Sequence, residues 1–203
     1  MSWYIILTIG SVAFCLAGCL NHIYKLIRLG KPKDFSERIG NVGSAVVYSF
    51  TGGMSPKKKE SAYLHLPTYS AGIIYHTGTF LSLGLFSYFL FDWNFNNKVL
   101  LGLSIILLIS TLCGAGILIK RIVKRELRSL SNPDDYISNI LVTAFQFITS
   151  YSLISFTPVY YIFVSALFLY IPVGKLKHVI YFFAARYHLG FFYGNRAVWP
   201  PKG

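Results

Sequence analysis

The chain has 203 residues, of which 54% are hydrophobic, 17% aromatic and only 13% charged. Soluble globular domains carry about 25% charged residues. Here the charges lie in a few blocks between long uncharged stretches, which excludes a soluble nucleic-acid-binding protein despite the net charge of +12. The apolar composition excludes intrinsic disorder. Three cysteines are too few for a secreted protein of this length that is held together by disulfide bonds. We therefore predict an all-α integral membrane protein.

Five apolar stretches are candidates for membrane-spanning helices, because a hydrocarbon core about 30 Å thick needs roughly 20 residues per helix. The first is not a cleaved signal peptide, since its basic residues follow the apolar run rather than precede it. We expect a single membrane domain, a bundle of five transmembrane helices, with the spans at about 3–20, 66–91, 99–119, 137–156 and 158–173.

The basic residues predict the orientation of this bundle. With five spans, the loops 25–63 and 120–136 and the tail 174–203 lie on one side of the membrane. They hold 18 of the 19 Lys and Arg residues, and only Lys98 falls on the other side. The positive-inside rule then places the N-terminus outside and the C-terminus in the cytoplasm. We expect a multi-pass protein of the inner, cytoplasmic membrane. We expect partners on the cytoplasmic side, with Trp199 and the prolines after it lying on one of them.

Histidines are the candidate functional groups in the spans, because no Asp, Glu, Lys or Arg lies deep in any of them. His76 is about ten residues into the second span and His178 lies just past the fifth. A b-type haem needs two neutral imidazoles from different helices and small residues beside them, such as Gly78. Each histidine is equally compatible with an ordinary interhelical hydrogen bond. A transporter is disfavoured, because embedded charges and discontinuous helices are not evident in the sequence.

The residues around both histidines resemble a known family. The run Pro-Val-Gly-Lys-Leu-Lys-His that ends at His178 is similar to the end of the last helix in nitrate reductase gamma-type cytochrome b subunits. That family includes the membrane cytochromes of heterodisulfide-reductase-like and sulfite-reduction-associated complexes. The segment Tyr-His-Thr-Gly at 75–78 resembles the family's aromatic-His-x-Gly on helix two, and 120–136 resembles its basic inner loop. The resemblance covers most of the chain from about residue 66 to residue 178.

The resemblance implies a haem count. Members of the family usually carry two stacked b haems, each with one ligand from helix two and one from helix five. His76 and His178 match the ligands of the inner haem. The positions of the outer ligands hold Phe86 or Ser87 on helix two and Tyr160 on helix five. Because both outer ligands are missing together, we predict one b haem.

A second alignment makes His65 the inner ligand and His76 the outer one. Eleven residues advance a helix by about 1100°, close to three whole turns, so both side chains would share a face. In that case His76 has no partner histidine on helix five. In the first alignment, Lys175 and Lys177 are candidates to stabilise haem propionates, or they are ordinary topology charges.

The expected function is that of a membrane cytochrome b subunit in a respiratory oxidoreductase complex. It would pass electrons between a membrane quinone and an iron–sulfur or molybdenum subunit on the cytoplasmic side. The quinone is expected near the inner haem or in the region of Phe86, Ser87 and Tyr160, where the outer haem would lie. The alternative is a haem-free membrane anchor for a cytoplasmic enzyme complex.

Overall fold

The computed structural model describes residues 2–30, 33–56, 64–91 and 93–201. Within these residues the protein is all-helical, with 81% helix and no strand, which confirms that the fold is all-α. The chain divides into two compact units, residues 1–16 with 67–176 and residues 17–66 with 177–203. The 3-10 helix η3 (Lys175–Lys177) lies where the sequence passes from the first unit to the second.

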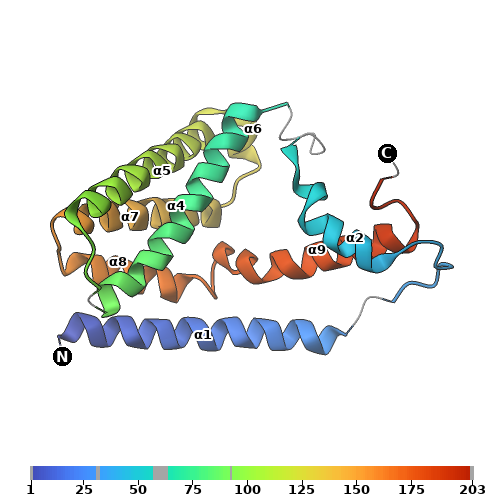
Figure 1. The fold of residues 1–203 in the computed structure, drawn as a ribbon, viewed down its shortest axis with the longest axis horizontal. Coiled ribbons are helices and arrows are strands. Elements are labelled where there is room, and N and C mark those ends of the chain that lie inside the picture. Colours follow the sequence, from blue (N-terminus) through green and yellow to red (C-terminus); the bar gives the residue numbers. More distant parts are fainter. Residues whose placement is uncertain (1, 31–32, 57–63, 92, 202–203) are drawn as a thin grey trace. The chain divides into compact units, whose positions relative to one another are not determined.

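The helices are distributed over the two units (Figure 1). The first unit holds the start of α1 (Trp3–Leu29), α4 (Leu66–Phe91), α5 (Asn97–Val123), α6 (Arg125–Ser129), α7 (Pro133–Ile154) and α8 (Val159–Tyr170). The second holds the remainder of α1, α2 (Val42–Phe50), the 3-10 helix η1 (Gly52–Met54) and α9 (His178–Asn195).

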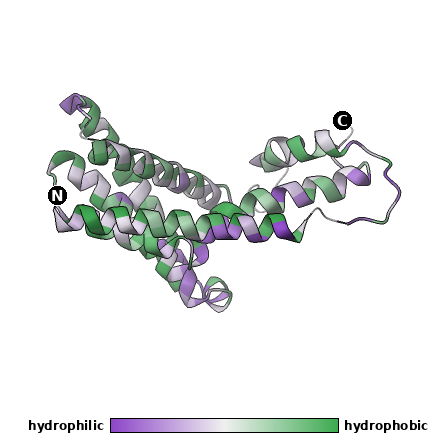
Figure 2. Ribbon diagram, turned by 90° about the horizontal axis from the view of Figure 1, so that it is seen from below, coloured by the Kyte–Doolittle hydropathy of each residue, from purple (hydrophilic) through white to green (hydrophobic). Residues whose placement is uncertain are grey.

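Four of the described helices, α1, α4, α5 and α7, are long and apolar enough to cross a membrane. Figure 2 shows hydrophobic residues along these helices and hydrophilic residues towards the end of α1 and in the connections. The bounds of α4 match the predicted span 66–91, whereas α1 continues to Leu29 instead of ending near Leu20. A fifth span is present only if α8 and α9 count as one broken span.

The expected fifth span, 158–173, is interrupted in the structure. With 12 residues, α8 is about 18 Å long, which is too short to cross the hydrocarbon core alone. Pro172 ends it, because proline has no N–H and its ring collides with the carbonyl of residue 168 in a continued helix. The N–H groups of Val173 and Gly174 both turn back to the Tyr170 carbonyl, at 3.1 and 2.8 Å. The expectation that no helix is discontinuous was therefore wrong.

Polar side chains join α4, α5 and α7 inside the first unit. The Gln146 amide of α7 is fully buried and donates to the Tyr75 carbonyl of α4 at 2.9 Å and to the Thr79 hydroxyl at 2.7 Å. Ser104 of α5 and Ser150 of α7 share a hydrogen bond of 2.8 Å between their hydroxyls. Hydrogen bonds of this kind hold helices together where the solvent is lipid.

Small residues let these helices approach closely. Gly78 of α4 is buried, and a Cβ at this position would lie 2.0 Å from the Ser110 hydroxyl oxygen of α5 and 3.3 Å from the Gln146 Oε1 atom. The Ser110 hydroxyl in turn donates to the Ile74 carbonyl at 3.0 Å. Gly78 thus sets the spacing between α4 and α5.

The second unit is built on a close contact between α2 and α9. Asn41 caps α2 by accepting from the Ser44 N–H, so a short helix lies within the loop 25–63. A Cβ on Gly190 would lie 2.5 Å from the Val46 Cα atom, and one on Gly194 would lie 2.6 Å from the Ala45 Cβ atom. The two glycines, one helical turn apart, therefore seat α9 directly against the α2 backbone.

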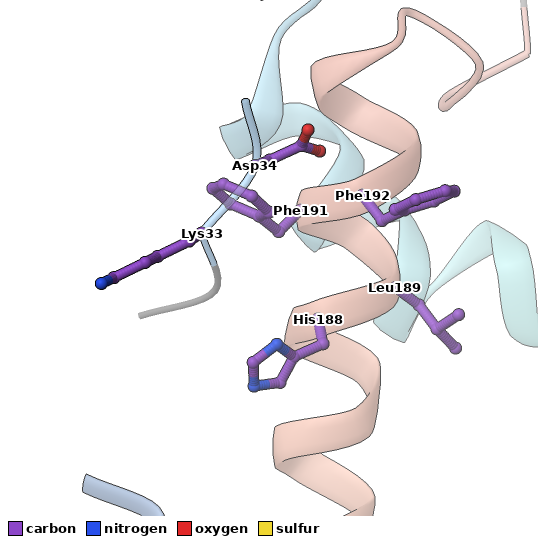
Figure 3. A pocket seen from close by; sticks show the side chains of 6 residues that line it. All are labelled: Lys33, Asp34, His188, Leu189, Phe191 and Phe192. Atoms are coloured by element: carbon purple, nitrogen blue, oxygen red, sulfur yellow. The ribbon is translucent and has the colours of Figure 1, made fainter. Parts of the chain in front are cut away.

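Segments at both ends of the second unit pack against this helix pair. Asp34 accepts from the Arg196 guanidinium at 2.6 and 3.3 Å, and Figure 3 shows Asp34 beside α9. The ring of Trp199 lies 4.6 Å from that of Tyr193 and 5.5 Å from that of Tyr48, measured between centroids. Trp199 thus packs on its own chain, and its expected contact with a partner subunit stays a prediction.

Gly78→Ala is predicted to destabilise the first unit by about 1–3 kcal/mol, since the added methyl group overpacks the contact with Ser110. Gly84→Ala on the same helix is the matched control, because a Cβ there meets nothing within 4 Å. Thermal unfolding of both variants in one detergent measures the difference. Equal melting temperatures for the two variants would contradict the packing role of Gly78.

Candidate functional site

His76 lies in the middle of α4 with its side chain exposed. Its Nδ1 atom is 2.7 Å from the Gly72 carbonyl oxygen, one turn earlier. A carbonyl oxygen only accepts, so Nδ1 carries a hydrogen, and in the tautomer with its single hydrogen there Nε2 has a lone pair that can bind a metal. Histidines that bind metals usually have this arrangement, with one ring nitrogen donating to a carbonyl or carboxylate and the other free to bind.

The predicted neighbours of His76 occupy different sides of α4. Gly78 is about 200° further round the helix and faces Ser110, so its lack of a side chain serves the packing of α4 on α5. Ser87 lies about 1100° on, which returns it to the side of His76 roughly 16 Å along the axis. Its side chain is exposed and its hydroxyl donates to the Gly84 carbonyl at 2.6 Å.

His178 is the first residue of α9, directly after η3, and its side chain is exposed. It belongs to the second unit, whereas His76 belongs to the first. His65 also belongs to the second unit and is exposed in the turn before α4. In the described part of the chain, His, Cys, Asp and Glu residues do not gather in groups of three or more that could hold a metal ion.

Lys175, expected beside a haem propionate, has a carboxylate partner in the protein. Its ammonium group donates to the Asp135 carboxylate, and the Arg121 guanidinium lies 3.4 Å from the same carboxylate oxygen. Asp135 is 6% exposed. This cluster of one acid and two bases joins the end of α5, the start of α7 and η3, three residues before His178. Lys177, the N-cap of α9, is partly buried.

Asp135 also belongs to the cap of α7, and the sequence alone did not single it out as part of an ion-pair cluster. The Asn132 side chain accepts from the Asp135 N–H at 3.0 Å, and the Asp135 carboxylate accepts from the Asn132 N–H at the same distance. Pro133 occupies the first turn. Proximity to Lys175, 40 residues later, could not be seen from local sequence.

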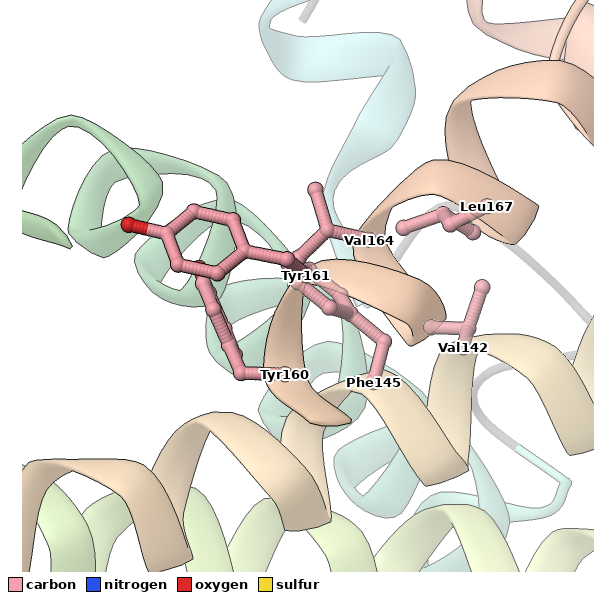
Figure 4. Close-up of a cluster of buried hydrophobic side chains, with 6 residues drawn as sticks. All are labelled: Val142, Phe145, Tyr160, Tyr161, Val164 and Leu167. Atoms are coloured by element: carbon pink, nitrogen blue, oxygen red, sulfur yellow. The ribbon is translucent and has the colours of Figure 1, made fainter. Parts of the chain in front are cut away.

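Tyr160 belongs to a cluster of buried hydrophobic side chains (Figure 4), and the partly buried Phe86 packs against this cluster. Tyr160 is fully buried, with its ring 4.4 Å from that of Phe89 and 6.5 Å from that of Phe145. Phe86 packs edge-on against Phe168 of α8 at 5.3 Å. Among the residues that the structure describes, the buried Tyr160 hydroxyl has no hydrogen-bond partner. The Thr149 hydroxyl, which donates to the Phe145 carbonyl, lies close to it, so one polar group and several aromatic rings surround the Tyr160 hydroxyl.

No protein-family model matches this chain, and searches of curated proteins and of solved structures also find no match. The residues and their geometry therefore carry the functional interpretation.

Asp135→Asn is predicted to destabilise the first unit by about 1–3 kcal/mol, because Lys175 and Arg121 lose the charge that both of them face. An asparagine keeps an acceptor for the Asn132 N–H, so the cap is retained. Asp134→Asn is the control: its carboxylate accepts from the Tyr170 hydroxyl, and an amide oxygen can replace it. Thermal unfolding of the two variants gives the comparison. A loss for Asp134→Asn as large as that for Asp135→Asn would contradict the role of the ion-pair cluster, because removing either acidic charge from the first turn of α7 would then have the same effect.

Proposed function

We propose that this protein is the membrane cytochrome b subunit of a respiratory oxidoreductase complex. His76 and His178 bind one b haem, and the subunit exchanges electrons between a membrane quinone and an iron–sulfur or molybdenum subunit on the cytoplasmic side. The haem supplies a one-electron carrier. The observation that carries the proposal is the hydrogen bond from His76 Nδ1 to the Gly72 carbonyl, which leaves Nε2 to bind iron.

The position of His76 supports this role. It is ten residues past the first residue of α4, about 15 Å along a helix that is long enough to span the hydrocarbon core. An exposed imidazole at this depth costs free energy unless a partner or ligand covers it, and polar groups inside membranes are candidates for function for that reason. The neighbouring Gly72 has nothing within 4 Å of its Cβ position, which leaves room beside the ring.

His178 supports the proposal through its place at the break between α8 and α9. Pro172 and Gly174 interrupt the helix, and the ion pair between Lys175 and Asp135 anchors the chain three residues before His178. This anchor limits the positions that the first turn of α9 can take. In our proposal Lys175 holds the ligand-bearing turn, and Lys177 is the remaining candidate for a haem propionate.

The proposed topology has five spans, the fifth made of α8 and the start of α9, with the N-terminus outside and the C-terminus in the cytoplasm. Lys25 and Arg28 in the last turns of α1, and Lys120 and Arg121 in the last turn of α5, support this orientation by the positive-inside rule. The membrane is then the cytoplasmic membrane. The redox partner then docks on the cytoplasmic side, which carries these basic residues.

His76→Ala and His178→Ala are each predicted to abolish b-haem binding, because one imidazole alone holds the iron weakly. His65→Ala is the control and should keep the full haem content. A reduced-minus-oxidised visible spectrum of each purified chain, with haem measured per protein, makes the comparison. Loss of haem in His65→Ala with retention in His178→Ala would support the second alignment. Absence of haem from the wild-type chain would favour the haem-free anchor.

Tyr160→Phe is predicted to lower quinol oxidation by the assembled complex about tenfold or more while leaving haem content unchanged, since it removes only the buried hydroxyl. Quinol turnover and the haem spectrum are measured on the same preparation. Unchanged turnover would remove Tyr160 from the quinone site, and loss of haem would make it part of the haem surroundings.

A further inference from the structure

A cavity of about 310 Å³ lies in the second unit, between the segment that follows α1 and the last turns of α9. Its lining combines charged and aromatic side chains (Figure 3): Lys33, Asp34, His188, Leu189, Phe191 and Phe192. In the figure, Lys33, Phe191 and His188 lie on one side of α9. The proposed electron transfer uses none of these residues.

The walls of this cavity are held in place by several contacts to the end of α9. The Arg196 guanidinium pairs with Asp34 and lies 3.8 Å from the centre of the Phe192 ring. The Asn195 amide donates to the Ser36 hydroxyl at 3.0 Å, and the Asn195 carbonyl accepts from the Ile39 N–H at 3.0 Å. The cavity is thus preformed rather than dependent on a loose loop.

The charge of the cavity is cationic. The Arg196 guanidinium holds the pKa of the Asp34 carboxyl well below its usual range, so Asp34 is ionised at neutral pH and its charge is balanced by Arg196. The other polar groups of the lining are the Lys33 ammonium and the His188 imidazole. In the part of the chain that the structure describes, neither forms a hydrogen bond or an ion pair. An ammonium and an imidazole beside apolar rings suit an anion that carries an apolar group.

The position of Lys33 along the chain places the cavity near the membrane surface. With 27 residues, α1 is about 40 Å long, which exceeds the hydrocarbon thickness, so its last turn with Arg28 reaches the headgroup layer. Lys33 follows Leu29 by four residues, and four residues span at most about 14 Å. Gly30, with a φ of 76°, turns the chain at the end of the helix. Lys33 is therefore within reach of lipid headgroups.

We propose that this cavity binds the phosphate of an anionic phospholipid. Lys33 and His188 donate to the phosphate oxygens, and Phe191, on the same side of α9, contacts the glycerol and the first methylenes of the acyl chains. Basic residues near the membrane surface attract anionic lipids. The proposal is independent of haem binding.

The test measures lipid binding to the full-length chain in detergent, by native mass spectrometry and by thermal stabilisation on addition of phosphatidylglycerol or phosphatidylcholine. The wild-type chain should prefer phosphatidylglycerol. Lys33→Gln and His188→Gln should each weaken phosphatidylglycerol binding about fivefold, and together about 25-fold. Lys25→Gln, which removes one charge from α1 outside the cavity, is the matched control and should keep the preference.

Two further measurements show whether the phosphate of a lipid or free phosphate is bound, and whether the variants lose binding because they misfold. Lys33→Arg keeps the charge and should retain the preference for phosphatidylglycerol. Inorganic phosphate should stabilise the wild-type chain far less than the lipid does. Equal stabilisation by inorganic phosphate, or an unchanged lipid preference in the double variant Lys33→Gln/His188→Gln, would overturn the proposal. So would a loss of preference in Lys25→Gln as large as that in Lys33→Gln.

Discussion

Hydrocarbon offers no hydrogen bonds, so a polar group buried in the membrane-spanning part of this protein must find its partner within the protein, on its own helix or on a neighbouring one. This constraint explains why the interior of the first unit is rich in small polar residues while large apolar residues lie outside. The Gln146 amide reaches the Tyr75 carbonyl and Thr79, and Ser104 meets Ser150. Together with the close approach at Gly78, these hydrogen bonds fix how α4, α5 and α7 sit on one another.

The same constraint makes polar atoms without a hydrogen-bond partner candidates for binding a ligand. His76 is exposed at mid-helix, with one ring nitrogen satisfied by its own helix and the other left to bind a ligand. The Tyr160 hydroxyl is buried among aromatic rings without a partner in the described residues. The proposed haem and quinone sites lie at these two positions, where the bundle leaves a polar atom to be covered. In the second unit, the same reasoning applies to Lys33 and His188 at the level of the headgroups.

The sequence predicted those features that depend on local composition. The apolar run 66–91 became α4 with the same bounds. The length of the last span was overestimated, because the hydropathy of 158–173 outweighed the effect of Pro172. The side of α4 that Gly78 occupies, and the pairing of Lys175 with Asp135, depend on residues 30 to 70 positions away. Periodicity along one helix carries no information about those contacts, and the family resemblance did not supply it.

The most direct test of the central claim is the haem content of the wild-type chain. The chain is purified from membranes in which haem is abundant, and the pyridine haemochrome spectrum is compared with the protein concentration from amino-acid analysis. The account predicts one b haem per chain. Two haems per chain would contradict the single-site arrangement, and a well-folded chain without haem would contradict the electron-carrier function itself.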